Sequence, residues 1–147
     1  MTSVLVLNGP NLNLLGTRQP EIYGHTTLAD VEDMCAAHAE THGFAVTCLQ
    51  SNHEGAMVDA IHAARGPNDG IVLNADANTQ TTNALHAAIV GTQLPVVELH
   101  LSNIHARETF RHKSYIAPVA VGMICGFGAT GYILALDALL GHLGRTT

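Results

Sequence analysis

The sequence predicts an α/β fold with a doubly wound five-stranded parallel sheet and helices on both faces. Two observations predict this fold class. Short apolar runs rich in β-branched residues alternate with helix-periodic segments along the whole chain. These runs are continuously apolar, which is typical of parallel strands that are buried on both faces. A length of 147 residues suits one domain, 1–147.

The first half of the chain contains two expected strands and two expected helices. An apolar run at 4–7 ends at the breaker Asn8-Gly9-Pro10, which predicts a strand followed by a loop. Apolar residues then recur at helical spacing from 28 to 39, after a capping Thr27 and before a terminating Gly43. A second strand is expected at 45–49, and apolar spacing at 58, 61 and 64 marks a helix that ends near 66–67.

The second half continues the alternation. A third strand at 71–73 stops at Asn74, and a helix is expected at 82–90. The last strands are expected at 96–99 and 119–124, followed by a helix at 130–143. This last helix is apolar on most faces, which predicts a contact with another subunit.

Composition excludes several classes of protein. Hydrophobic residues make up 47% of the chain, which excludes general disorder, and a net charge of −6 excludes a broad basic surface for nucleic acid. The three cysteines, an odd and widely spaced set, indicate free thiols in a reducing cytoplasm. The N-terminus lacks the pattern of a signal peptide. The apolar stretch 119–140 is interrupted by glycines, which favours a strand, a turn and a helix over a membrane span.

A long loop after the first expected strand contains the first candidate catalytic pair. It runs from Asn8 to Tyr23 and is longer than most strand-to-helix connections, which is typical of functional loops. Arg18 lies within reach along this loop, and a nearby cation lowers the pKa of a phenol. Tyr23 is therefore a candidate base for a proton beside a carbonyl. An ordinary loop aromatic is the alternative.

The fourth expected strand ends in the second candidate. His100 stands at its carboxyl end, where general acids are often placed, and Glu98 lies two residues earlier on the same face of the strand. This spacing predicts that the carboxylate orients the imidazole. A surface histidine is the alternative.

The residues after His100 favour an anionic ligand. The backbone N–H groups of Leu101 and Ser102 would hold a carboxylate if a short helix started there. Arg107 and Arg111 are four residues apart, and a shared helical face would add two cations. A solvated charged face is the alternative.

Three other features of the sequence do not indicate a binding site or a catalytic group. The motif GxGxxG at 126–131 precedes the last helix, and no following strand carries the acid that binds a ribose. Cys35, His38 and His42 lack a fourth metal ligand at motif spacing. Lys113, the sole lysine, stands in a polar loop that does not suit a Schiff base.

Three segments together carry a family resemblance, namely 8–16 with 18–24, then 50–55, then 98–108. Through them the chain resembles the type II 3-dehydroquinate dehydratases, flavodoxin-like enzymes of the shikimate and quinate pathways, over nearly its whole length. The resemblance implies a cytoplasmic lyase that uses no metal, cofactor or Schiff base. It also implies a homododecamer built from trimers, a cyclic carboxylate substrate, and no nucleic-acid or membrane partner.

The resemblance also implies a mechanism. Tyr23 would be the base, and Arg18 and Arg107 would promote its ionisation, so that it removes a proton beside the ketone and leaves an enolate. His100, oriented by Glu98, would then protonate the departing hydroxyl.

The resemblance further implies the binding residues. Asn11 would hold a water that stabilises the enolate oxygen. The remaining set would hold the hydroxyls and the carboxylate of the substrate: Asn74, Arg111, and the backbone of Leu101 and Ser102.

One segment departs from the family pattern. Gln80 stands where a substrate-binding histidine is expected, and Ala87 stands where an aspartate reaches a neighbouring subunit. His86 replaces an arginine, and Asp76 adds a negative charge. These departures leave two other functions open: a paralogue that dehydrates or isomerises another cyclic hydroxy-ketone carboxylate, and a non-catalytic binder of a small carboxylate.

Overall fold

The computed structural model describes residues 1–17, 20–76, 83–109 and 113–146. Within them, five parallel strands form one sheet in the order β2-β1-β3-β4-β5. This is the strand order of flavodoxin-like folds, and it confirms the predicted fold class. The strands are β1 (Ser3–Asn8), β2 (Ala45–Gln50), β3 (Gly70–Asn74), β4 (Val96–His100) and β5 (Gly122–Cys125).

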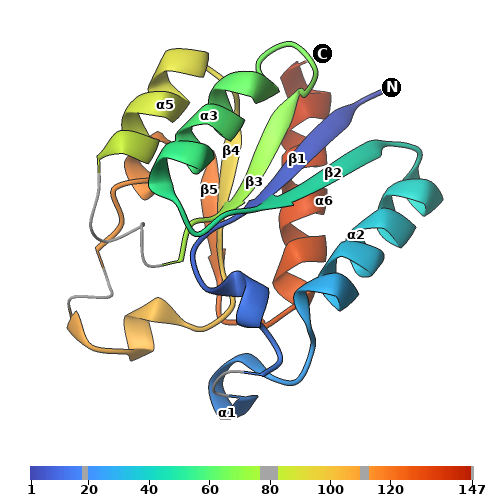
Figure 1. The fold of residues 1–147 in the computed structure, drawn as a ribbon. Coiled ribbons are helices and arrows are strands. Elements are labelled where there is room, and N and C mark those ends of the chain that lie inside the picture. Colours follow the sequence, from blue (N-terminus) through green and yellow to red (C-terminus); the bar gives the residue numbers. More distant parts are fainter. Residues whose placement is uncertain (18–19, 77–82, 110–112, 147) are drawn as a thin grey trace.

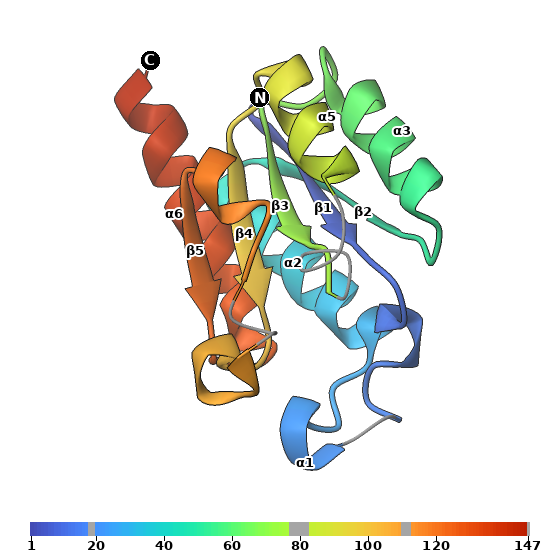
Figure 2. The same cartoon turned by 90° about the vertical axis from the view of Figure 1, so that its left-hand side faces the viewer.

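Helices cover both faces of the sheet, as Figure 1 and the turned view in Figure 2 show. One face carries α3 (Glu54–Ala64) and α5 (Ala84–Thr92), and the other carries α2 (Leu28–His42) and α6 (Thr130–Thr146). A single-turn helix, α1 (Pro20–Tyr23), lies in the long loop beyond the carboxyl edge of the sheet.

Alternating side chains of the strands divide the core into two layers. Val4 and Val6 of β1 pack with α2 and α6, whereas Leu5 and Leu7 pack with α3 and α5. The central strands β1, β3 and β4 are almost entirely buried, as their continuous apolar runs predict. The strands β2 and β5 are only partly buried because each lies at an edge of the sheet.

The boundaries of α2 agree with the sequence signals. The Thr27 hydroxyl accepts from Asp30 N–H, and the Asp30 carboxylate accepts from Thr27 N–H, which forms a capping box. The helix then ends at Gly43, whose φ of 73° is left-handed.

The strand expected at 119–124 is wrong in its first part. Residues Ala117–Val119 form a short 3₁₀ helix, and β5 begins only at Gly122. Pro118 explains the difference, because it lacks the N–H that a ladder needs and its fixed φ suits the first turn of a helix. The helix expected at 82–90 is described as Ala84–Thr92.

The apolar character of α6 is largely explained within the chain. Its buried side chains pack on the sheet, and they are Tyr132, Ala135, Leu136 and Leu139. Gly131 lets the helix approach β4, because a Cβ there would lie 2.7 Å from Leu99 Cδ1. All three cysteines are free thiols. In the described part of the chain, no helix combines the length and the apolar character that crossing a membrane requires.

Candidate active site

Polar residues form a row where four neighbouring strands end. The register pairs Asn8 with Gln50 on β2 and with Asn74 on β3. Leu73 is paired with Glu98, so His100 at the end of β4 continues the row. The order of the strands reverses between β1 and β3, and doubly wound sheets bind their ligands at such a point, beyond the carboxyl ends.

His100 and Glu98 form a buried pair on the α3–α5 side of the sheet. The ring Nε2 of His100 lies 2.5 Å from Glu98 Oε2, and the two residues are 5% and 0% exposed. The predicted contact between this carboxylate and the imidazole is therefore present. Ser114 adds a second partner, because its hydroxyl donates to the same carboxylate at 2.8 and 3.0 Å.

A second polar group lies on the α2–α6 side of the same edge. Tyr132 of α6 donates its hydroxyl to Asn8 Oδ1 at 2.6 Å and accepts from Asn74 Nδ2 at 3.1 Å. All three residues are buried, and burial raises the pKa of the Tyr132 phenol well above its ordinary value. Asn8 Nδ2 has no hydrogen-bond partner among the described residues.

The start of the long loop is fixed against β2. Asn11 adopts a left-handed conformation with φ 68°, and its N–H donates to Asn52 Oδ1 at 2.9 Å. Gln50 Nε2 donates both to this same oxygen, at 3.0 Å, and to the Gly9 carbonyl, at 3.2 Å. The segment 50–52 therefore sets the path of the chain through Asn11.

No helix starts at Leu101 or Ser102, which was the condition for their N–H groups to hold a carboxylate at a helix N-terminus. A single 3₁₀ turn spans Ile104–Ala106, because the Asn103 side chain caps it by accepting from His105 N–H at 3.1 Å. Leu101 is buried and Ser102 is half-buried just before this turn.

The shared helical face suggested for Arg107 and Arg111 stays a prediction, because Arg111 lies outside the described residues. The turn ends at Ala106, and Arg107 itself has extended backbone angles. Its guanidinium Nη1 donates to Ser102 Oγ over a long 3.4 Å, so this cation lies beside the segment that follows His100.

Several predicted site residues fall outside the described residues. They are Arg18, Gln80 and Arg111. Tyr23 closes α1, but its side chain is also outside the description. The structure therefore brings Glu98, His100 and Asn74 to one edge, and the convergence of the other side chains on them stays a prediction.

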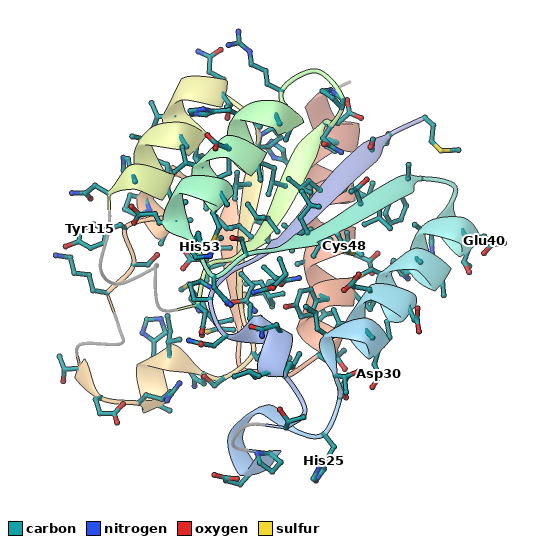
Figure 3. The ribbon with its side chains drawn as sticks, in the orientation of Figure 1. His25, Asp30, Glu40, Cys48, His53 and Tyr115 are labelled. Atoms are coloured by element: carbon teal, nitrogen blue, oxygen red, sulfur yellow. The ribbon has the colours of Figure 1, made fainter. Side chains whose placement is uncertain are left out.

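The described residues of the departing segment lie next to this edge. Asp76 follows β3 with a left-handed φ of 51°. On α5, His86 Nδ1 donates to the Tyr115 carbonyl at 2.6 Å, and Ala87 is exposed. Figure 3 draws Tyr115 on the segment before β5 and His53 at the start of α3. Lys113 stands 4.6 Å above the Tyr115 ring and is exposed, which does not suit a Schiff base.

Sequence reasoning assigned no role to three residues of this edge: Asn52, Ser114 and Tyr132. Tyr132 carries a detectable signal, because it shares helical spacing with buried apolar residues and a buried phenol needs a hydrogen-bond partner. Ser114 stands in a polar stretch of sequence and carries no such signal.

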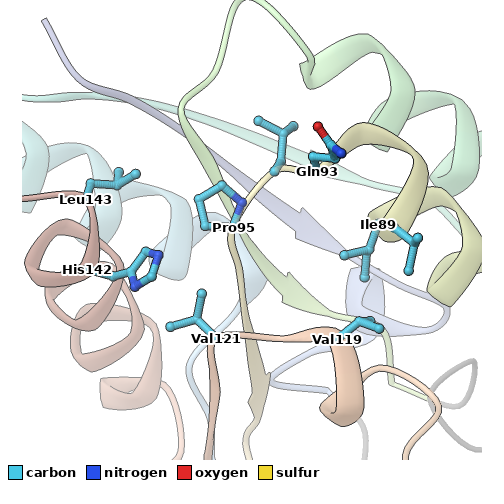
Figure 4. Close-up of a pocket in the computed structure, with 9 residues that line it drawn as sticks. Ile89, Gln93, Pro95, Val119, Val121, His142 and Leu143 are labelled. Atoms are coloured by element: carbon cyan, nitrogen blue, oxygen red, sulfur yellow. The ribbon is translucent and has the colours of Figure 1, made fainter. Parts of the chain in front are cut away.

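An apolar hollow of about 550 Å³ lies elsewhere, as Figure 4 shows. It is lined by Pro95 and Val121, which precede β4 and β5, and by His142 near the end of α6. It therefore lies at the amino ends of the strands, opposite the polar row.

Known proteins are similar to this chain over nearly its full length. A family model described as Dehydroquinase class II matches residues 2–140. A 3-dehydroquinate dehydratase of Ruegeria pomeroyi is 70% identical over 143 residues, which cover 97% of this chain and 96% of that protein. One of Dinoroseobacter shibae is 59% identical over 140 residues, covering 95% and 93%. The crystal structure of a type II dehydroquinase from Butyrivibrio crossotus matches with a TM-score of 0.93 at 41% identity, covering 95% and 97%.

Proposed function

The chain belongs to the class II dehydroquinase family, and we propose that it dehydrates 3-dehydroquinate to 3-dehydroshikimate through an enolate, with Tyr23 as base and His100 as acid. Family membership confirms the resemblance that the sequence motifs indicate. The 70% identity to a named 3-dehydroquinate dehydratase over nearly the whole chain supports the same reaction and substrate.

The observation that carries the mechanism is the buried pair of His100 and Glu98 at the carboxyl edge. A carboxylate against Nε2 accepts its hydrogen and holds the ring in one orientation. Nδ1 is then the nitrogen that gives its proton to the departing hydroxyl. The carbon–oxygen bond breaks as the enolate collapses, and water leaves.

The base acts first in this scheme. The Tyr23 phenolate takes the proton from the carbon beside the ketone, and Arg18 and Arg107 favour the phenolate by their charge. One contact supports this placement of the loop. Gly16 lies against the backbone of His25, with 2.8 Å from its would-be Cβ to the His25 carbonyl oxygen, so the residues that flank 17–24, the part of the sequence with Arg18 and Tyr23, lie side by side.

Substrate binding is assigned to the residues around this edge. Asn11 would hold a water on the enolate oxygen, and Arg107 would face the carboxylate region from beside Ser102. The others hold hydroxyls and the carboxylate: Asn74, Gln80, Arg111, and the backbone of Leu101 and Ser102.

The segment after β3 favours a second candidate, a paralogue acting on another cyclic hydroxy-ketone carboxylate. Asp76 stands at the end of the edge, where a negative charge opposes an anionic substrate. His86 is engaged by the Tyr115 carbonyl, and Ala87 presents only a methyl group. Turnover of such an acid in preference to 3-dehydroquinate would establish this candidate.

Assembly and context are part of the proposal. A cytoplasmic dodecamer built from trimers would cover apolar side chains that are exposed in one chain, such as Val90 at 54% and Leu134 at 40%. Light scattering coupled to size exclusion measures the mass, and a monomer would contradict this assembly. The pathway would be shikimate synthesis or quinate breakdown.

The test is an ultraviolet assay that follows the conjugated enone of dehydroshikimate. We expect turnover by the wild type, and its loss in Tyr23→Phe and in His100→Ala. Tyr115→Phe and His142→Ala are matched controls that change the same residue types outside the proposed machinery, and they should retain turnover. Ligand binding without turnover by the wild type would instead indicate a non-catalytic binder of a small carboxylate.

A further inference from the structure

We propose that Ser114 is a positioning residue for the acid: its hydroxyl holds Glu98 as a hydrogen-bond acceptor and, through Glu98, sets which nitrogen of His100 carries the transferable proton. This inference rests on the proposed function, because it assumes that His100 is the acid. Ser114 lies 14 positions beyond His100 in the sequence and reaches Glu98 only through the fold.

The direction of the hydrogen bond is fixed by the other partners of Ser114. A serine hydroxyl has one hydrogen to donate and two lone pairs to accept with. The N–H groups of Ile116 and Ala117 both donate to Ser114 Oγ at 3.0 Å and occupy the two lone pairs. The hydroxyl hydrogen is therefore left for Glu98, whose two oxygens lie 3.0 and 2.8 Å away.

Ser114 supplies the buried Glu98 carboxylate with a hydrogen-bond donor. The carboxylate is fully buried, and an ionised carboxylate without donors in such a place is strongly destabilised. Oε2 receives both the Ser114 hydroxyl and the Nε2 hydrogen of His100. Because Nε2 is committed to Glu98, Nδ1 is the ring nitrogen left for the substrate.

Ser114 is itself held in place by contacts that do not involve substrate. Ile116, two residues later, is fully buried in the α3–α5 layer of the core. The Tyr115 carbonyl between them accepts from His86 of α5 at 2.6 Å. The segment is therefore anchored on both sides, so the hydroxyl is already aimed at Glu98 before catalysis.

The first test compares three variants by steady-state kinetics. Ser114→Ala should lower kcat by about tenfold, a part of the 10²–10⁴ that a general acid contributes, and leave KM within about twofold. Ser114→Thr restores the hydroxyl and should recover most of kcat. Ser3→Ala is the matched control, because Ser3 accepts a 3.0 Å hydrogen bond from Asn68 at the opposite edge of the sheet.

A double-mutant cycle tests whether Ser114 acts through Glu98. If it does, Ser114→Ala should cost little further kcat in a Glu98→Gln background. If the double variant loses kcat by the product of the two separate reductions, the inference is overturned. The ¹⁵N chemical shifts of the neutral His100 ring provide an independent readout. We expect hydrogen on Nε2 in the wild type, which leaves Nδ1 to take up the transferable proton, and a tautomer mixture in Ser114→Ala.

The outcomes separate this inference from the function on which it rests. Retained turnover in His100→Ala overturns the mechanism itself. Lost turnover in His100→Ala with unchanged kcat in Ser114→Ala overturns only the role of Ser114, even if the melting temperature falls. If Ser114→Ala fails to fold, Ser114→Cys replaces it, because it keeps a side chain of similar size and weakens the hydrogen-bond donation. Its kcat should fall while its KM stays unchanged. An unchanged kcat would overturn the inference.

Discussion

The Tyr132 hydroxyl of α6 donates to Asn8 Oδ1 at the end of β1, across 2.6 Å and 124 positions of sequence. It also accepts from Asn74 at the end of β3. The last helix therefore ties together the two strands between which the sheet reverses its order. Since Asn74 is proposed to bind substrate, one phenol links the stability of the fold to the geometry of the site.

Removing this hydroxyl should affect both stability and binding. Tyr132→Phe leaves the buried amides of Asn8 and Asn74 without their shared partner. Unpartnered buried polar groups cost about 1–3 kcal/mol, so we expect a loss of that size in the free energy of unfolding. KM should rise more than kcat falls. Urea unfolding and steady-state kinetics measure the two effects, and Tyr115→Phe is the control. Equal KM values in the wild type and in Tyr132→Phe would contradict the link to Asn74.

The same phenol predicts a loss of stability in alkali. Burial raises the pKa of Tyr132, so above about pH 10 the unfolded chain releases a proton that the folded chain keeps. The unfolded state then binds fewer protons, and stability falls as pH rises, by at most about 1.4 kcal/mol per pH unit. Urea midpoints measured from pH 8 to pH 11 should fall more steeply in the wild type than in Tyr132→Phe. Equal slopes of the urea midpoint against pH in the two proteins would contradict the assignment of this effect to Tyr132.

Gly9 is required by close backbone packing. A Cβ there would lie 2.5 Å from the Ala75 carbonyl oxygen, and Gly9 N–H donates to the Asn74 carbonyl at 2.8 Å. Gly9→Ala must therefore move the end of β1 or of β3, and we expect lower stability together with lower kcat/KM. Gly91→Ala is the matched control, because a Cβ at this exposed position of α5 meets nothing within 4 Å. It should stabilise by about 0.5–1 kcal/mol. Thermal melts and the enone assay compare the two variants. A Gly9→Ala enzyme with the melting temperature and kcat/KM of the wild type would refute the packing argument.

The capping box predicts an acid-sensitive part of stability at the start of α2. Thr27→Ala should cost about 1 kcal/mol through loss of the N-cap. The hydrogen bond from the Thr27 N–H lowers the pKa of Asp30. The contribution of Asp30 is therefore present above the ordinary carboxyl pKa of about 4 and disappears as pH falls through the lower folded value. The difference in the free energy of unfolding between the wild type and Asp30→Ala should therefore shrink from neutral to acidic pH. A difference that stays constant would contradict the assignment to Asp30.

Local patterns in the sequence predicted most of the helices and strands and, within the proposed chemistry, the contact of the acid with its carboxylate. The apolar runs predicted the central strands because such runs have to be buried on both faces. The two-residue spacing of Glu98 and His100 predicted their contact because alternate residues of a strand share a face. The errors are local as well. Pro118 redirected the backbone where apolar spacing had indicated a strand, and the Asn103 cap starts the short helical turn beyond Leu101 and Ser102.

Only the tertiary structure decided which residues from distant parts of the chain become hydrogen-bond partners. Ser114 reaches Glu98, Tyr132 reaches Asn8 and Asn74, and neither contact follows from spacing. Both depend on the order of the strands and on how α6 and the segment before β5 dock on them. A sequence establishes which residues need burial or a hydrogen-bond partner, but the choice of partner is made by packing, because it depends on which distant surfaces are brought together.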